Sequence, residues 1–496
     1  MGSWFGEVAC LIAGALLTLS FAPFEIFPLA ILAPAILLAA WLTASTARAF
    51  LRGLIFGMGF FGTGVSWVFI SMHDFGNVPI WLSVIITMGF VLILALFPAT
   101  NGYVFNRYFP KTSPAKIICV FPATWVLFEW IRSWIFTGFP WLFLGYSQMD
   151  SPLKGYAPFM SVYAVSLAVA VSSALLLSAI LSFKREQAKN AYFYLFGLAL
   201  IWALGGSLSF LSFTKSDGKP FQVSLVQGNV PQELKWVPEH LQPTLDLYQH
   251  LTEQHWDSKI IIWPEAAVPI TLQDAQDYLA GITTQATKHD AAVITGIFIK
   301  SPQSHEYYNS VITLGKGSGL YIKQHLLPFG EFTPIKRYIG KLLDFFQIPM
   351  SDVSPGDGKL FPIIVNGIKI STFLCYEIAF PEEVLRHDGN IGIILTATND
   401  AWFGHSIAQV QHLEMARMRS LELGRPGLFV GNSGLTAFIT PTGKIQSAAQ
   451  PFEQTVLTDI VQPTQGHTPW QRFGMDPILL ILIILLFFGW KQCRPK

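Results

Sequence analysis

Long apolar runs, broken by short polar connections, make up the chain as far as Phe213. Seven such runs occur there, and an eighth lies close to the C-terminus. A helix needs roughly 17–25 apolar residues to cross about 30 Å of hydrocarbon, and most of the runs approach that length. We therefore expect eight membrane-spanning helices. They are Val8–Ala22, Phe27–Thr43, Leu54–Ser71, Ile80–Pro98, Ile117–Phe139, Met160–Phe183, Tyr192–Phe213 and Ile478–Trp490.

The pattern changes after the seventh run, because residues 215–475 contain no apolar stretch of spanning length. Short strand-like runs and helical patterns alternate there, which is typical of a layered α/β domain with more than one sheet. The expected strands are Gln222–Gln227, Lys259–Trp263, Ala292–Ile299, Ser310–Leu314, Leu320–His325, Lys369–Cys375, Ile391–Ala397, Leu428–Gly431 and Leu435–Thr440. The expected helices are Pro238–Gln254, Gln273–Lys288, Phe380–His387 and Ser406–Leu423.

Positively charged residues are unevenly distributed among the connections. Eleven Lys and Arg residues follow runs two, four, six and eight, whereas the connections after runs one, three and five hold only Arg132 and Lys154. The positive-inside rule makes the side with eleven charges cytoplasmic, so an odd number of spans brings residues 215–475 to the extracytoplasmic face. The eleven are Arg48, Arg52, Arg107, Lys111, Lys116, Lys184, Arg185, Lys189, Lys491, Arg494 and Lys496.

Three domains follow from these patterns. Residues 1–214 form a transmembrane domain with seven helices, residues 215–475 form an extracytoplasmic domain, and residues 476–496 form a C-terminal transmembrane helix with a cytoplasmic tail. Near the fifth run, Glu129 and Arg132 lie three residues apart and are a candidate intramembrane ion pair. Such a pair either has a function or fixes the packing of the helices.

The composition supports a membrane protein and argues against a nucleic-acid partner. Of the 496 residues 52% are hydrophobic and 13% are charged, about half of the roughly 25% charged residues usual in soluble domains. The 32 Lys and Arg against 31 Asp and Glu give a net charge of +1, and within residues 215–475 the counts of 19 and 24 give −5. A domain with that balance has no electrostatic reason to bind DNA.

Four chemically capable side chains lie at strand ends or turns of the α/β domain. Glu265 follows the apolar run Ile260–Trp263 and a proline that cannot continue a strand ladder. Lys323 lies in the Leu320–His325 strand, Glu331 lies just past a turn, and Cys375 ends the Lys369–Cys375 strand. One Glu or Lys alone is usually a solvated surface charge, and one cysteine is usually a small core residue. A carboxylate, an ammonium group and a thiol together can supply a base, an electrostatic stabiliser and a nucleophile.

The order Glu265, Lys323, Cys375 is similar to that of the nitrilase superfamily, whose domain is an αββα sandwich. With seven spans before it and one after it, the whole chain resembles the apolipoprotein N-acyltransferase family of the bacterial inner membrane. Five further motifs carry the resemblance. They are Gln227–Gln232 with Lys235–Trp236, Tyr308–Ser310, Asn399–Gly404, Ala416–Glu422 and Gly424–Pro426.

The resemblance implies a two-step transfer of a fatty acyl chain. The donor is a phospholipid such as phosphatidylethanolamine, and the acceptor is the α-amine of the N-terminal diacylglyceryl-cysteine of an apolipoprotein. Cys375 is expected to be the nucleophile that carries the acyl chain as a thioester, Glu265 the general base, and Lys323 the stabiliser of the oxyanion. Glu331 is expected to hold Lys323 or to share the role of base.

Further residues are candidates for substrate binding, and no cofactor or metal is expected. Tyr376 and Glu377 are expected to shape the pocket and to supply a backbone donor. Trp236, Phe329 and Trp402, in turn-like stretches, form either a lid or acyl-chain wall, or buried core. The histidines are scattered, and His405 and His412 are spaced unsuitably for a metal site. The substrate-binding candidates are Trp236, Asn309, Phe329, Tyr376, Glu377 and Trp402.

Two other functions remain possible from the sequence. The same site on the same anchor could belong to a membrane-anchored amidase or nitrilase that uses water as the acceptor. A transporter with an extracytoplasmic binding domain is the other alternative, but few charges lie within the spans to line a polar path.

Overall fold

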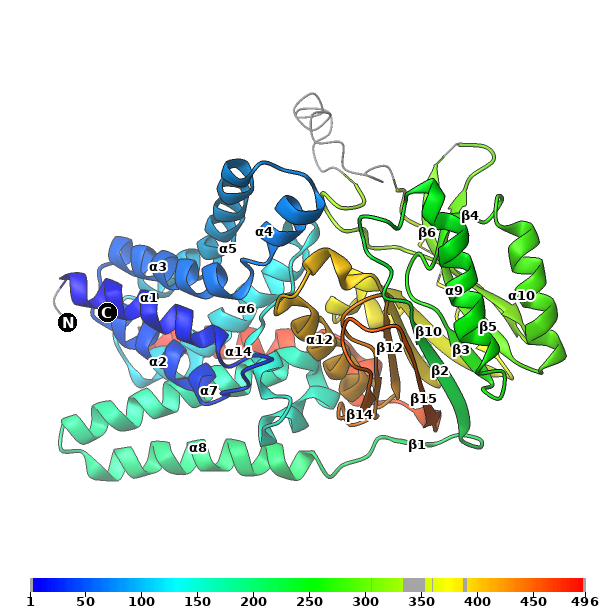
Figure 1. The fold of residues 1–496 in the computed structure, drawn as a ribbon. Helices are drawn as coiled ribbons and strands as arrows, with labels where there is room; N and C mark the ends of the chain where they lie inside the picture. Colours follow the sequence, from blue (N-terminus) through cyan, green and yellow to red (C-terminus); the bar gives the residue numbers. More distant parts are fainter. Residues whose placement is uncertain (1–2, 305, 333–352, 359, 387–389, 494–496) are drawn as a thin grey trace. The chain divides into compact units, whose positions relative to one another are not determined.

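The computed structural model describes residues 3–304, 306–332, 353–358, 360–386 and 390–493 (Figure 1). Arg494 and Lys496, two of the basic residues expected on the cytoplasmic side, lie outside the described residues. The chain divides into two compact units. The first comprises Met1–Phe69, Pro79–Ser212 and Arg472–Lys496, and the second comprises Ile70–Val78 and Phe213–Gln471.

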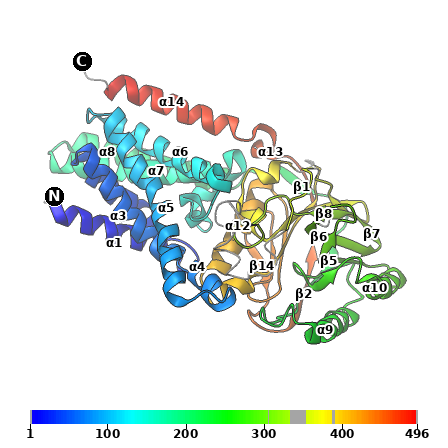
Figure 2. The ribbon, with the colours of Figure 1, turned by 90° about the horizontal axis from the view of Figure 1, so that it is seen from above.

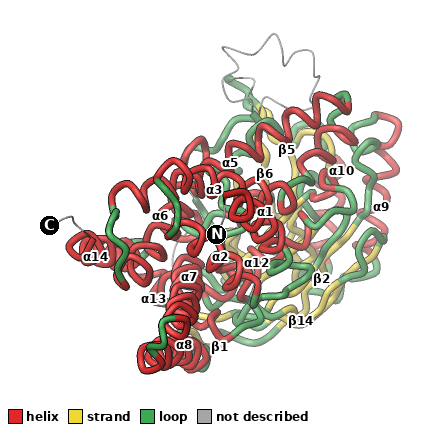
Figure 3. Tube along the Cα trace, turned by 90° about the vertical axis from the view of Figure 1, so that its left-hand side faces the viewer, coloured by secondary structure: helices red, strands yellow, loops and turns green. Residues whose placement is uncertain are grey.

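In its described residues the first unit consists of helices and the loops that join them (Figure 3). Five of its segments are long and apolar enough to span a membrane: Ile80–Tyr108, Lys116–Thr137, Pro152–Lys184, Ala188–Leu208 and Asp476–Cys493. The helices are α1 (Ser3–Thr18), α2 (Leu29–Leu42), α3 (Thr46–Gly64), α4 (Val68–Ile70), α5 (Ile80–Tyr108), α6 (Phe121–Trp134), α7 (Ala157–Lys184), α8 (Ala188–Leu208) and α14 (Asp476–Cys493).

The other three expected spans differ from the sequence-based prediction. The third run forms α3 and a second helical piece, Val68–Phe75, bent by 59° from it, and the two count as one span only if taken together. The first two runs are the 16-residue α1 and the 14-residue α2. At 1.5 Å per residue each reaches only about 21–24 Å, less than the thickness of the hydrocarbon core. The structure therefore supports five or six of the eight spans by length.

Small residues allow the helices of the first unit to approach closely. A Cβ atom added at Gly57 of α3 would lie 2.6 Å from the Cα atom of Ala95 on α5. Small side chains at such crossings permit backbone-to-backbone packing where no hydrophobic effect drives association in lipid. At the other end of the sequence, α14 packs along α6 (Figure 2).

Glu129 and Arg132 both form hydrogen bonds to the loop that follows α6. The Glu129 Oε1 atom accepts hydrogen bonds from Trp125 Nε1 at 3.0 Å and from the Leu144 backbone N–H at 2.8 Å. Arg132 Nη1 donates to the carbonyl oxygens of Phe139 and Trp141. These bonds satisfy backbone groups of a single loop. They therefore support the alternative in which Glu129 and Arg132 fix the packing of the helices.

The second unit contains two seven-stranded sheets and a two-stranded ladder, counted over the described residues. The first sheet has the order β15-β2-β3-β5-β6-β8, with β4 paired to β5, and the second has the order β14-β13-β12-β11-β10-β9-β7. The strands are β1 (Thr214–Ser216), β2 (Phe221–Gln227), β3 (Ile260–Ile262), β4 (Val268–Thr271), β5 (Ala292–Lys300), β6 (Tyr307–Gly315), β7 (Gly317–Ser318), β8 (Leu320–Ile322), β9 (Ile363–Val365), β10 (Ile368–Leu374), β11 (Ile393–Thr398), β12 (Gly427–Gly431), β13 (Ala437–Ile439), β14 (Ile445–Ala448), β15 (Thr455–Val461) and β16 (Thr464–Gly466).

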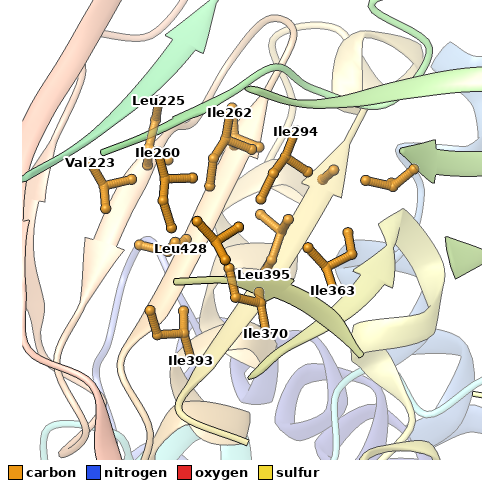
Figure 4. Packing of buried hydrophobic residues seen from close by; sticks show 14 of the residues in the cluster. Val223, Leu225, Ile260, Ile262, Ile294, Ile363, Ile370, Ile393, Leu395 and Leu428 are labelled. Carbon is orange, nitrogen blue, oxygen red and sulfur yellow. The ribbon is translucent and has the colours of Figure 1, made fainter. Parts of the chain in front are cut away.

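Alternate residues of each central strand face opposite layers. Ile260 and Ile262 of β3 contact residues of β10–β12 in the core between the two sheets, where Figure 4 shows them beside Leu395 and Leu428. Ile261, between them, faces the helices α9 (Leu241–Glu253) and α10 (Gln276–Lys288). Strands buried on both faces read as continuous apolar runs, which explains the run Ile260–Trp263. Helix α12 (Ala408–Leu423) packs on β12 of the other sheet, so the layers form the expected αββα sandwich (Figure 1).

The nine strands predicted from the sequence are all present, with ends shifted by up to three residues. The helix predicted at Phe380–His387 is wrong: the described part contains only a short 3₁₀ turn, Glu383–Arg386, and His387 lies outside the described residues. A single turn of apolar spacing does not offset the cost of nucleating a helix there. Strand β15, which pairs along its length with β2, was not predicted, because its polar residues Thr455, Thr458 and Asp459 hide the alternation.

Candidate active site

The candidate catalytic residues follow strands that end together. Strands β2, β3 and β5 are mutually parallel in the first sheet, and β10, β11 and β12 are parallel in the second. Parallel strands present their carboxyl ends at one edge, where α/β folds bind ligands. Glu265 follows β3, and Cys375 follows β10. Lys323 follows β8, whose antiparallel pairing with β6 brings it opposite Asn309.

Glu265 is held by bonds to both of its carboxylate oxygens. Oε1 accepts from Asn309 Nδ2 at 2.8 Å and lies 3.3 Å from Lys323 Nζ, while Oε2 accepts from the backbone N–H of Asn399 at 3.0 Å. The side chain is 9% exposed. The backbone carbonyl of Glu265 accepts a hydrogen bond from Lys235 Nζ at 3.1 Å, so a second buried lysine fixes this turn. Burial lowers the pKa of Lys235 to about 8, against the opposing charge of Glu265.

The turn that carries Glu265 fits against a glycine of β5. A Cβ atom added at Gly296 would lie 2.6 Å from the Pro264 carbonyl oxygen, 2.6 Å from the Ala266 nitrogen and 2.7 Å from the Glu265 Cα atom. These neighbours are backbone atoms, which cannot rotate away as a side chain can. Glycine at this position therefore sets how closely Glu265 approaches the sheet.

Gly296→Ala is expected to lower about a hundredfold the rate of the Cys375 acylation that the family resemblance predicts, because the turn must move and a displacement of about 1 Å at a reacting group has that effect. It is also expected to destabilise the fold by about 1–3 kcal/mol through overpacking. The acylation rate and the thermal unfolding of the purified chain measure the two effects. The matched control is Gly281→Ala in α10, where nothing lies within 4 Å of the added Cβ atom. Equal rates for the two variants would contradict the assigned role of Gly296.

Lys323 lies between two carboxylates. Its Nζ atom is 3.3 Å from Glu265 Oε1 and 2.8 Å from Glu331 Oε2, and it donates to Glu331 Oε1 at 2.9 Å. Asn309 Nδ2 donates to Oε1 of both carboxylates at 2.8 Å each, which completes a closed network of four side chains. Burial alone would lower the pKa of Lys323, but the charges of Glu265 and Glu331 outweigh it and raise the pKa above its usual value. Lys323 is therefore an ammonium ion at neutral pH.

Cys375 begins the 3₁₀ turn Cys375–Ala379 with a φ of +50°, a left-handed conformation that a residue with a Cβ atom rarely adopts. Backbone strain of this kind clusters at functional sites. As a whole residue, Cys375 is intermediate between buried and exposed. Burial, and then the charge of Glu265, raise its pKa well above the usual value, although the charge of Lys323 opposes the shift. The resting side chain is thus a thiol, and it needs a base to become a nucleophile.

Four groups donate hydrogen bonds to the Glu377 carboxylate. Its oxygens accept from the backbone N–H groups of Leu374, Gln324 and His325 at 2.7–3.0 Å and from the hydroxyl of Tyr321 at 2.8 Å. The residue is 2% exposed. Its pKa is raised by burial, against the lowering effects of Lys323 and of these backbone groups. The carboxylate joins the end of β10 to the Lys323 loop.

The aromatic candidates have different environments. Tyr376 is buried and packs edge-on against Phe380, with ring centroids 5.0 Å apart. Trp236 is half-buried against Phe298, and Phe329 is 50% exposed with a φ of +63°. The half-buried Trp402 contacts the segment Ile70–Val78: its carbonyl oxygen accepts from Ser71 Oγ at 2.8 Å, and its ring lies 6.2 Å from that of Phe75.

Several residues near the site were not predicted. Asn399, Asp400 and Lys235 occur in motifs that carried the family resemblance, but no role was assigned to them. His412 was considered only as a metal ligand, although its Nε2 atom lies 3.0 Å from the Cys375 carbonyl oxygen. Their contacts join segments far apart in the chain, as when Lys235 donates to the Glu265 carbonyl oxygen or Asn399 N–H donates to Glu265 Oε2. The positions of these residues in the sequence carry no signal for such contacts.

The αββα sandwich of the second unit is the fold of a carbon-nitrogen hydrolase domain of the nitrilase type. The family model for carbon-nitrogen hydrolases matches residues 222–468, and the model for the apolipoprotein N-acyltransferase N-terminal domain matches residues 13–175. The chain belongs to the apolipoprotein N-acyltransferase family, and it is an acyltransferase.

Curated relatives match nearly the whole chain. The apolipoprotein N-acyltransferase of Coxiella burnetii is 44% identical over 97% of this chain and 99% of its own length. That of Methylococcus capsulatus is 41% identical over 95% of this chain and 92% of its own. Among solved structures, Nit3 of Saccharomyces cerevisiae, a nitrilase-superfamily member, aligns with 53% of this chain and 98% of its own, with a TM-score of 0.37 and 15% identity.

Proposed function

We propose that this enzyme transfers a fatty acyl chain from a phospholipid to the α-amine of the N-terminal diacylglyceryl-cysteine of apolipoproteins through a thioester on Cys375. The observation that supports the mechanism is the hydrogen-bonded network of Glu265, Lys323, Glu331 and Asn309, together with the strained Cys375, on whose thiol the charges of Glu265 and Lys323 act. A protonated thiol, a fixed carboxylate and a buried ammonium group are the three parts that covalent acyl transfer requires.

Glu265 is the general base in both halves of the reaction. It accepts the thiol proton while the Cys375 sulfur attacks the ester carbonyl carbon of the phospholipid. The sulfur–carbon bond forms, the ester carbon–oxygen bond breaks, and the proton passes to the departing lysophospholipid oxygen. The amine then attacks the thioester carbon and gives its proton to Glu265. The carbon–sulfur bond breaks, and the proton returns to the sulfur.

Lys323 stabilises the oxyanion that forms in each half. Its buried ammonium group keeps its charge, and a preorganised donor of this kind contributes about 3–4 kcal/mol to the transition state. Glu331 contacts Lys323 through both carboxylate oxygens and also accepts a hydrogen bond from the Leu327 N–H at 2.8 Å. These contacts support a role for Glu331 in positioning Lys323. Glu377, which accepts hydrogen bonds from the backbone N–H groups of Leu374, Gln324 and His325, positions the turn that carries the nucleophile and shapes the pocket.

The substrate-binding residues are proposed from their positions. Asn309 Oδ1 is buried and has no hydrogen-bond partner among the described residues, which leaves it able to accept from the incoming amine. Trp236, Phe329 and Trp402 are partly exposed aromatic residues suited to an acyl-chain wall. Tyr376 is buried beside the nucleophile and shapes the pocket.

The enzyme acts at the bacterial inner membrane with its catalytic domain on the periplasmic side. The skew of Lys and Arg residues among the connections supports this orientation. Our proposed topology keeps eight spans, with domains at residues 1–214, 215–475 and 476–496. In this topology the short helices α1 and α2 must either cross the membrane with little tilt or thin the bilayer around them. A membrane site is needed because withdrawing lipid substrates from the bilayer costs about 0.8 kcal/mol for each exposed CH₂ group.

Mass spectrometry of the intact enzyme after incubation with phosphatidylethanolamine tests the proposal. We expect an added mass of one fatty acyl group, mapped to Cys375, that persists without an amine and disappears when a diacylglyceryl-cysteine peptide is added. Rapid hydrolysis without the peptide would favour the amidase alternative, in which water is the acceptor. Absence of any adduct on Cys375 would contradict the thioester route.

A further inference from the structure

A buried histidine of α12 joins the ends of two neighbouring strands. His412 is 1% exposed. Its Nε2 atom lies 3.0 Å from the carbonyl oxygen of Cys375, which follows β10, and its Nδ1 atom lies 3.0 Å from both carboxylate oxygens of Asp400, which lies just beyond β11. Strands β10 and β11 are parallel neighbours. The imidazole ring therefore bridges the nucleophile turn and the adjacent strand end.

The partners of the ring fix its protonation state. A carbonyl oxygen and a carboxylate can only accept hydrogen bonds, so both ring nitrogens must carry a proton. His412 is then an imidazolium ion that forms a buried ion pair with Asp400. Burial by itself would lower the pKa of His412, but the charge and hydrogen bonds of Asp400 and the Cys375 carbonyl raise it above its usual value. Thr398 Oγ1 donates to Asp400 Oδ1 at 2.7 Å and fixes the carboxylate from its other side.

The bond to the Cys375 carbonyl also orients the next N–H group. The peptide between Cys375 and Tyr376 is planar, and in a trans peptide the N–H points opposite to the C=O. Holding the carbonyl toward α12 therefore directs the Tyr376 N–H away from α12. The positive charge on the ring polarises the same peptide group and strengthens that N–H as a donor.

We propose that His412 is a positioning residue that, as an imidazolium held by Asp400, orients the Cys375–Tyr376 peptide so that the Tyr376 N–H stabilises the oxyanion of the tetrahedral intermediate. The inference rests on the proposed function of Cys375 as the nucleophile. His412 transfers no proton and touches no substrate. The charges of Asp400 and Glu265 act on both this ring and the thiol, and the charge of Lys323 acts on the thiol.

Two variants separate the bonds that the ring makes. His412→Gln places an amide N–H where Nε2 was, so it retains a donor to the Cys375 carbonyl. His412→Asn places one where Nδ1 was, so it retains only the bond to Asp400. Each variant is tested in the full-length enzyme by two rates at Cys375: acylation by phosphatidylethanolamine, which forms an oxyanion, and alkylation by iodoacetamide, which does not. Peptide mapping distinguishes Cys375 from the other cysteines.

We expect His412→Asn to lower the acylation rate about a hundredfold, the usual effect of losing one oxyanion donor, while alkylation changes less than threefold. His412→Gln is expected to keep acylation within about fivefold of the wild type. If His412→Asn does not fold, Asp400→Asn with His412→Leu leaves no unpaired buried charge and carries the same expectation.

Three results would overturn the inference: an unchanged acylation rate, an equal loss of acylation and alkylation, or an equal loss of acylation in the Asn and Gln variants. The second would mean that His412 serves the thiol or the fold in general. Failure of the wild-type enzyme to acylate Cys375, with normal alkylation, would instead refute the proposed function itself.

Discussion

Cys375→Ala is expected to abolish both the acyl adduct and transfer to a diacylglyceryl-cysteine peptide. The sulfur is the atom that carries the acyl chain, and none of the carboxylates or amines of the network can replace it in a two-step transfer. Alanine keeps the Cβ atom, so the backbone strain at φ +50° is unchanged and the fold should be retained. Transfer of a radiolabelled acyl chain to the peptide measures the loss.

The control for this variant is Cys119→Ala, which removes a cysteine of the first unit. It is expected to acylate the peptide at the wild-type rate. Residual transfer by Cys375→Ala above the uncatalysed background would show that the amine attacks the phospholipid directly. That result would rule out the thioester even if Glu265 and Lys323 were both required.

Glu265→Gln is expected to lower the acylation rate by about 10²–10⁴, the usual contribution of a general base. The raised pKa of Cys375 makes the effect large, because the thiol is protonated at neutral pH and an amide cannot accept its proton. The amide nitrogen would also face one of the present donors, Asn309, Lys323 or the Asn399 N–H. Single-turnover formation of the Cys375 adduct measures the rate.

Glu331→Gln is the matched control, because Glu331 shares the contacts with Lys323 and Asn309. If Glu331 only holds Lys323 in place, Glu331→Gln should lower the acylation rate about tenfold, since Lys323 keeps its charge and one carboxylate partner. Equal losses in the two variants would mean that the carboxylates share the role of base. A Glu265→Gln variant as fast as the wild type would refute the assignment of the base.

The α/β unit could be predicted from the sequence because its strands obey simple rules. Strands such as β3 and β10 are buried on both faces and so appear as short apolar runs between turn residues. The candidate catalytic residues Glu265 and Cys375 lie just after such runs, so they could be identified from the sequence alone. Lys323 was placed within a strand but follows its last residue, Ile322.

Other features depend on contacts that a single sequence does not encode locally. The role of Gly296 arises from a turn on a neighbouring strand, and that of His412 from two strand ends far from it in the chain. The hydrophobic runs misplace the ends of α1 and overstate the length of α2, because turns around Ser20 and Pro28 end the first helix early and delay the second within apolar sequence. Hydropathy reports residue type and does not detect such turns.

The placement of Ile70–Val78 has a consequence for how the second unit can be produced as a separate polypeptide. This stretch is encoded between two apolar helices, yet it is counted with the second unit and bonds to the backbone at Trp402. A shortened gene that starts at Phe213 would yield a polypeptide without these neighbours of Trp402. A water-soluble fragment for crystallisation or screening would therefore need this loop grafted back, for instance through a designed linker.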